Sequence, residues 1–237
     1  MRLRELLEKQ FVQFYGISTK DITVDLIISQ EKEFDLDDMS SPIHTVPVGE
    51  GKLTIKDNDT SLEIVHYEDF INQCKKPQSF ARGRKRCDYI ICSNIDDVSS
   101  GGHIILAELT SALGDRDHLL IPIKDSDGNV VFSDGKIGKA TLQLEESLHT
   151  LMSVPEISDM FKSMTDKQCV MAYKLIRYNN KVKRLEHPMN RYLSIESNET
   201  RNNGAIIPHD GINRFGFLYR RICQPAFLSF GNYVHMY

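Results

Sequence analysis

The sequence predicts a mixed α/β fold, in which a central β-sheet is flanked by helices. Three apolar runs rich in β-forming residues predict strands over residues 61–67, 87–94 and 103–111. A long amphipathic helix is predicted over residues 136–154, because leucines recur there at helical spacing. A further strand is predicted over residues 167–178. Strands interspersed with helices in this way are typical of a sheet with helices packed against it.

Composition and charge exclude several classes of protein. Of the 237 residues, 41% are hydrophobic and 26% are charged, as in an average globular protein. No window approaches the roughly 18 consecutive apolar residues of a transmembrane helix. Charges interrupt the apolar residues at the start of the chain, which argues against a signal peptide. The five cysteines lack CxxC spacing and indicate reduced thiols. We therefore expect a cytoplasmic protein with no membrane partner.

The chain divides into a predicted core at residues 60–178 and two flanking segments. The N-terminal segment, residues 1–59, contains a predicted helix over 2–15, whose apolar face is formed by leucines and phenylalanines up to Phe14. A strand over 22–29 follows, and the acidic stretch 31–41 is predicted to be a loop.

The C-terminal extension, residues 179–237, shows no clear periodicity. It is polar at first and then aromatic, in the runs FGFLYRRI and PAFLSFGNYVHMY. These aromatic runs could pack on the core, bind a protein partner or form a homo-oligomer.

Two acidic residues stand near the ends of neighbouring predicted strands. Asp88 begins the strand 87–94, and Glu108 lies near the end of the strand 103–111. The turn-rich residues 95–102 between them indicate an antiparallel pair, in which the two carboxylates approach each other and could share one cation. Oxygen ligands suit Mg²⁺ or Mn²⁺. Burying both carboxylates without a metal would be costly, because like charges raise each other's pKa.

This order of elements resembles the PD-(D/E)XK nuclease superfamily, whose core is called restriction-endonuclease-like. The resemblance covers about half of the chain and rests on RCDYII, IILAELT and the helix that carries QLEESL. It implies that Asp88 and Glu108 hold the metal ion and that Gln143 belongs to the site. It also implies hydrolysis of phosphodiester bonds, in DNA rather than RNA, in a repair or antiviral defence setting.

The chain departs from the superfamily pattern at Thr110, which stands where the motif has a lysine. That lysine orients the attacking water and stabilises negative charge, whereas a threonine hydroxyl carries no charge. Lys139 and Lys136, at the start of the long helix, could substitute for it. Otherwise the chain is a catalytically inactive relative that binds nucleic acid or a protein partner. A third possibility is an interaction protein of unrelated function.

A short basic run, Arg82, Arg84, Lys85 and Arg86, precedes Asp88 and could contact phosphates. The net charge of −4 argues against a protein that coats nucleic acid by charge alone. The superfamily often has a further acidic residue before the core, for which Glu63 and Glu68 are equal candidates. His103 opens the second strand and could line the site.

Overall fold

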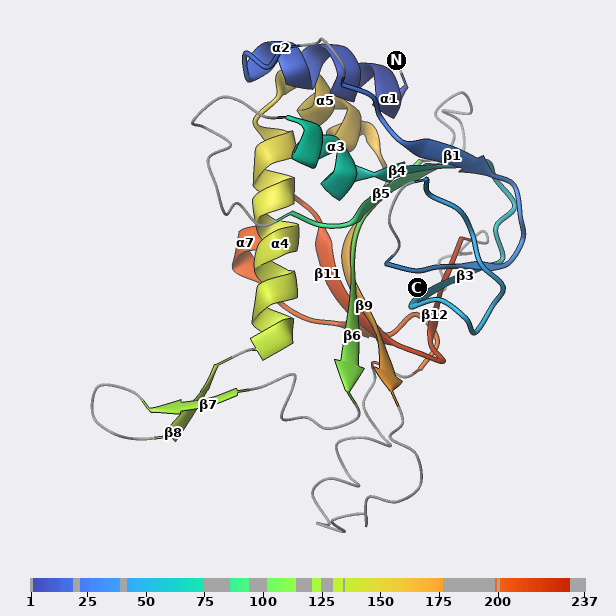
Figure 1. Ribbon diagram of the computed structural model, residues 1–237, viewed down its shortest axis with the longest axis vertical. Coiled ribbons are helices and arrows are strands. Elements are labelled where there is room, and N and C mark those ends of the chain that lie inside the picture. Colours follow the sequence, from blue (N-terminus) through green and yellow to red (C-terminus); the bar gives the residue numbers. More distant parts are fainter. Residues whose placement is uncertain are drawn as a thin grey trace.

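A seven-stranded mixed sheet forms the centre of the molecule (Figure 1). The computed structural model describes residues 2–18, 22–38, 42–74, 86–93, 102–113, 121–124, 130–133, 135–176, 199 and 201–230. The strand order is β1 (Leu26–Ser29), β4 (Leu62–His66), β5 (Tyr89–Ser93), β6 (His103–Leu113), β9 (Asp166–Ile176), β11 (Leu218–Cys223) and β10 (Ala205–Ile206). Strands β1, β4, β5 and β6 are successively antiparallel, whereas β6, β9 and β11 run parallel.

The predicted pairing of the two central strands is confirmed. Strands β5 and β6 are antiparallel neighbours, with Tyr89 opposite Ala107 and Cys92 opposite Ile104. Residues 89–93 of β5 and 104–109 of β6 are buried on both faces, as their continuous apolar sequences indicate. The prediction of a mixed α/β fold with a central sheet flanked by helices therefore holds.

Helices cover one face of the large sheet (Figure 1). They are an N-terminal helix in three parts, α1 (Leu3–Glu5), η1 (Leu6–Phe11, π-helical) and α2 (Val12–Phe14), followed by α3 (Tyr67–Gln73), α4 (Gly135–Met152), α5 (Pro155–Ser163) and α7 (Asp210–Asn213). Within the described residues, no helix is long and apolar enough to cross a membrane.

Helix α4 packs against β6 and β9 through buried Leu144, Leu148 and Leu151. We expected all leucines of this helix to be buried, and for Leu142 this is wrong, since it is 45% exposed. Leu142 precedes Leu144 by two residues, which is about 200° around the helix, so it points away from the sheet. Phe14 is also half exposed, because the π-helical turn before it rotates the following residues off the apolar face.

A smaller three-stranded sheet covers the other face of the large sheet. Its order is β12 (Phe227–Ser229), β3 (Leu53–Lys56) and β2 (Phe34–Leu36). The prediction of a loop over residues 31–41 is wrong at β2, where Phe34 and Leu36 are buried in the second apolar core. Asp35 between them is also buried, and its carboxylate accepts hydrogen bonds from the N–H groups of Gly49 and Gly51.

Strands from both flanking segments enter these sheets. In the N-terminal segment, β1 pairs with β4, while in the C-terminal extension β11 pairs with β9 and β12 pairs with β3. The aromatic residues Phe217 and Tyr219 are buried in the core between the sheet and the helices. The remaining strands, β7 (Ile121–Lys124) and β8 (Val130–Ser133), form a separate antiparallel pair.

Candidate functional site

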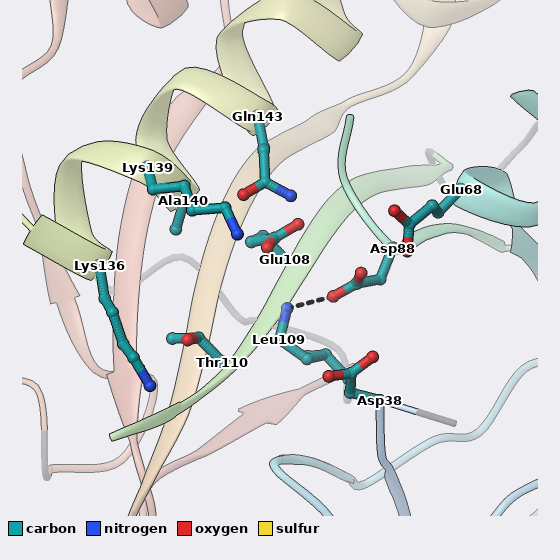
Figure 2. A pocket seen from close by; sticks show the side chains of 10 residues that line it. All are labelled: Asp38, Glu68, Asp88, Glu108, Leu109, Thr110, Lys136, Lys139, Ala140 and Gln143. Atoms are coloured by element: carbon teal, nitrogen blue, oxygen red, sulfur yellow. Dashed lines mark hydrogen bonds between the residues drawn. The ribbon is translucent and has the colours of Figure 1, made fainter. Parts of the chain in front are cut away.

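A pocket of about 350 Å³ lies where β5, β6 and α4 meet the segment that follows β2. Most of the side chains that line it are charged or polar (Figure 2). The lining residues are Asp38, Glu68, Asp88, Glu108, Leu109, Thr110, Lys136, Lys139, Ala140 and Gln143. All five residues that the sequence predicts to be catalytic are therefore brought together in one pocket.

Asp88 is fixed through both its side chain and its backbone. Its Oδ2 accepts a hydrogen bond from the N–H of Leu109, at 2.6 Å. Its carbonyl accepts hydrogen bonds from the N–H groups of Tyr67 and Glu68, at 2.8 and 3.2 Å, which ties the start of α3 to this strand. The side chain is only 5% exposed, so the carboxylate has little freedom to leave the pocket.

Glu108 faces the helices because side chains alternate along β6. Ala107 and Leu109 belong to the core beneath the small sheet, whereas Leu106 belongs to the core beneath the helices. Glu108 is two residues from Leu106, so its side chain lies on the same side of β6 and points toward α4, where it lies beside Gln143 (Figure 2). It is only 6% exposed.

The pocket makes ionisation of both carboxylates unfavourable. Burial raises the pKa of Glu108, and the negative charges of Asp88 and Glu68 raise it further. Burial also raises the pKa of Asp88, although the hydrogen bond from Leu109 opposes this rise. Two carboxylates that both have a raised pKa need either a proton or a cation between them.

Two buried oxygen atoms in the pocket, Oε2 of Glu108 and Oε1 of Gln143, have no hydrogen-bond partner among the described residues. The Gln143 amide is oriented by its other end, because Nε2 donates to the carbonyl of Arg86 at 2.8 Å. Buried acceptors that lack a donor are costly. A bound cation would satisfy both, so the residues fit a metal ion.

The donor atoms also indicate which metal. Among the described residues, no group of three His, Cys, Asp or Glu side chains is close enough to enclose a metal ion. Mg²⁺ does not need such a cage, since it is usually held by one or two carboxylates together with water and substrate phosphate. Asp88 and Glu108 could therefore hold Mg²⁺ or Mn²⁺, with Glu68 nearby in the same pocket.

Lys139 and Lys136 reach the pocket from the first turns of α4, on the side of Glu108 (Figure 2). The charge of Lys139 lowers the pKa of Glu108 and so opposes the effect of burial. Within the described part of the chain, no ion pair joins Lys139 to Asp88 or Glu108. Thr110 lies on the same side of β6 as Glu108, two residues further along the strand.

The structure separates the two candidates for the further acidic residue. Glu68 lines the pocket, whereas Glu63 lies on β4 and accepts a hydrogen bond from the N–H of Arg4 at 3.2 Å. His103 does not line the pocket, because its Nδ1 lies 3.0 Å from Oδ2 of Asp166 at the opposite end of β6. Asp38 was not predicted, since the acidic run around it gives no sign of a contact with Asp88.

Of the predicted phosphate-binding residues, only Arg86 is among the described residues, and Arg82, Arg84 and Lys85 lie outside them. Arg86 directly precedes Cys87, and its carbonyl holds Gln143. Its side chain is not among those that line the pocket.

No protein-family model, curated protein or solved structure matches the chain. Inference of function therefore depends on the chemistry of the pocket and on the sequence motifs.

Proposed function

We propose that the chain is a metal-dependent nuclease with a restriction-endonuclease-like core. The observation that carries the proposal is the convergence of Asp88, Glu108, Lys139 and Gln143 in one pocket, with two buried acceptor atoms left unpartnered. Asp88, Glu108 and Gln143 are the residues that the resemblance implies, and Lys139 is one of the two lysines that could substitute for the motif lysine. Their order along the chain also agrees with the order of motifs in the PD-(D/E)XK superfamily.

In this proposal Asp88 and Glu108 hold one Mg²⁺ or Mn²⁺ ion. When bound, the ion polarises a phosphodiester and lowers the pKa of water at the site. The hydrogen bond from Leu109 keeps the Asp88 carboxylate in a fixed orientation. Gln143 supplies a carbonyl oxygen whose direction is set by its bond to Arg86.

Lys139 supplies the positive charge that the superfamily places on the strand. Its ammonium reaches the pocket from α4 and acts on Glu108 without pairing with it. A lysine that is not neutralised by a carboxylate is free to stabilise the negative charge that develops on a phosphate. Thr110 can contribute a hydrogen bond only.

The proposed substrate is DNA, because the superfamily resemblance implies it. A setting in defence or repair is part of the same proposal. The net charge of −4 limits binding by general charge attraction, so phosphate contacts would be local.

The proposal is tested by incubating the purified chain with plasmid DNA and with RNA, in Mg²⁺, in Mn²⁺ and in EDTA. We expect cleavage with either metal and none in EDTA. Asp88→Asn and Glu108→Gln should each abolish cleavage without unfolding the protein. Glu63→Gln is the matched control, because Glu63 is a half-buried carboxylate of the same sheet outside the pocket. Equal cleavage by wild type and both pocket variants would refute the proposal.

A second candidate is a catalytically inactive relative that binds nucleic acid or a protein. Thr110 in the position of the motif lysine is the observation that favours it. This candidate predicts DNA binding that weakens steeply with salt and persists in Asp88→Asn, with no cleavage by wild type in any metal.

A further inference from the structure

The small sheet brings a further carboxylate, Asp38, to the pocket that holds Asp88 and Glu108. Asp38 comes from the segment after β2, on the opposite face of the large sheet from α4. Its side chain is 55% exposed, so it lies at the mouth of the pocket. An exposed aspartate in such a segment keeps a defined position only if neighbouring groups hold it.

Two contacts hold this segment in place. The hydroxyl of Tyr89 donates a hydrogen bond of 2.7 Å to the carbonyl of Asp37. Tyr89 is 2% exposed and directly follows Asp88, so the anchor is next to the candidate metal ligand. The Nζ of Lys52 lies 3.2 Å from Oδ2 of Asp38 and 3.4 Å from Oδ1 of Asp37.

Lys52 is itself well fixed. Its side chain is 13% exposed, and its backbone N–H donates to the carbonyl of Leu36 at 2.8 Å, at the end of β2. The turn before it is held by Asp35, which accepts hydrogen bonds from Gly49 and Gly51. A lysine this well buried and paired with two carboxylates is more restrained than an exposed surface pair.

We infer that Lys52 is a positioning residue of the metal centre, which holds the Asp38 carboxylate at the pocket mouth so that Asp38 strengthens cation binding. The inference rests on the proposed function, because it assumes a cation at Asp88 and Glu108. A cluster of acidic side chains would not by itself indicate a cation. The buried and unpartnered oxygens of Glu108 and Gln143 independently indicate a cation in this pocket.

The direction in which Lys52→Met changes the Mn²⁺ affinity separates this positioning role from a purely electrostatic one. If Lys52 acted only as a positive charge near the site, Lys52→Met would remove a repulsion and Mn²⁺ would bind more tightly. If Lys52 positions Asp38, the same change releases the carboxylate and Mn²⁺ binds more weakly. The two roles therefore predict opposite changes in affinity.

The experiment measures Mn²⁺ binding to the full chain by titration calorimetry, with a thermal melt of each variant to verify folding. We expect Lys52→Met and Asp38→Asn each to weaken binding about tenfold, as loss of a supporting group around a metal site typically does. The double variant should be no weaker than either single variant, because both remove the same interaction. Lys52→Arg should retain most of the affinity.

Lys56→Met is the matched control. Lys56 also belongs to the small sheet and pairs with Glu33 at 3.4 Å, but neither residue lines the pocket. Its loss should leave Mn²⁺ affinity unchanged. The inference is overturned if Lys52→Met binds Mn²⁺ as tightly as wild type or more tightly. If Lys52→Met fails to fold, Lys52→Gln is the second variant, because it keeps a polar side chain but removes the ion pair with Asp38, and it should likewise weaken Mn²⁺ binding.

The outcomes also distinguish this inference from the proposed function. If wild type binds Mn²⁺ and Asp88→Asn abolishes binding, while Lys52→Met and Asp38→Asn do not change it, only the role of Lys52 is refuted. If wild type does not bind Mn²⁺, the proposed function and the inference are both refuted.

Discussion

The carboxylate of Asp88 accepts a hydrogen bond of 2.6 Å from the backbone N–H of Leu109, the residue that follows Glu108. This single bond fixes one acidic side chain relative to the strand that carries the other. Because the donor is a backbone N–H, only proline at position 109 would remove it directly. The relative position of the two carboxylates is thus set by the pairing of β5 with β6.

The stability of the metal-free protein should fall as the pH rises. The pKa of Glu108 is raised in the folded state, so the folded protein binds more protons than the unfolded chain above the unfolded value of about 4.3. Stability is therefore lost as the pH rises from that value through the raised pKa. Glu108→Gln should flatten this dependence, whereas Glu146→Gln, on the exposed face of α4, should not. Melting temperatures recorded in EDTA between about pH 5 and pH 9 measure this pH dependence of stability. Equal slopes of melting temperature against pH for wild type and Glu108→Gln would contradict the prediction.

Lys139→Met should reduce cleavage by on the order of 100-fold and leave Mn²⁺ binding intact. In the proposed mechanism the lysine acts on the phosphate, while Asp88 and Glu108 hold the cation. Mn²⁺ affinity should even rise slightly, since a positive charge near Glu108 has been removed. Cleavage rates and Mn²⁺ titrations of the same preparation are compared. Lys162→Met, in the last turn of α5, serves as the control. Undiminished cleavage by Lys139→Met would exclude Lys139 from catalysis.

Thr110→Lys should restore cleavage to the Lys139→Met variant. Thr110 lies two residues beyond Glu108 on the same side of β6, so a lysine there can direct its ammonium into the pocket. We expect at least about a tenfold gain over Lys139→Met alone. No gain, together with intact Mn²⁺ binding, would show that a charge at the strand position cannot replace one on α4.

Two leucines of α4 should differ sharply in their contribution to stability. Leu148 is fully buried, so Leu148→Ala should lower the free energy of unfolding by about 3 kcal/mol. Leu142 is 45% exposed, and Leu142→Ala should change the free energy of unfolding by less than about 0.5 kcal/mol. Urea denaturation measures both, and similar losses would contradict the packing of α4 on the sheet.

The central part of the fold could be predicted because its signals are local. The apolar runs around Ile90 and Ile105 identify buried strands, and the leucine spacing of α4 identifies the face that packs on them. The acidic pair could be located because Asp88 and Glu108 occupy defined positions on those strands. Asp88 and Glu108 are close enough in the sequence for two consecutive antiparallel strands to bring them together.

Other features depend on contacts that no local pattern reveals. Strand β2 lies in an acidic stretch, and its burial depends on pairing with β3 and on hydrogen bonds to Asp35 from a distant turn. Asp38 reaches the pocket because Tyr89, 52 residues after Asp37, donates a hydrogen bond to the carbonyl of Asp37 and because Lys52 pairs with the Asp38 carboxylate. Strand β11 pairs with β9, although β9 ends more than 40 residues earlier in the chain. The aromatic sequence of β11 shows no clear alternation of apolar and polar residues.

Glu108 lies on β6 and Asp88 directly precedes β5 in the large sheet, whereas Lys139 lies on α4. A small sliding of α4 over the sheet would therefore change the distance from Lys139 to the phosphate while the spacing of Asp88 and Glu108 stayed constant. A ligand or partner that pressed on the exposed side of α4, near Leu142, could in this way change the rate of cleavage more than the affinity for the cation, because Asp88 and Glu108 would stay in place and only Gln143 would move with α4. Mutations on the exposed side of α4 would then alter the rate more than the metal affinity, whereas mutations of Asp88 or Glu108 would alter both.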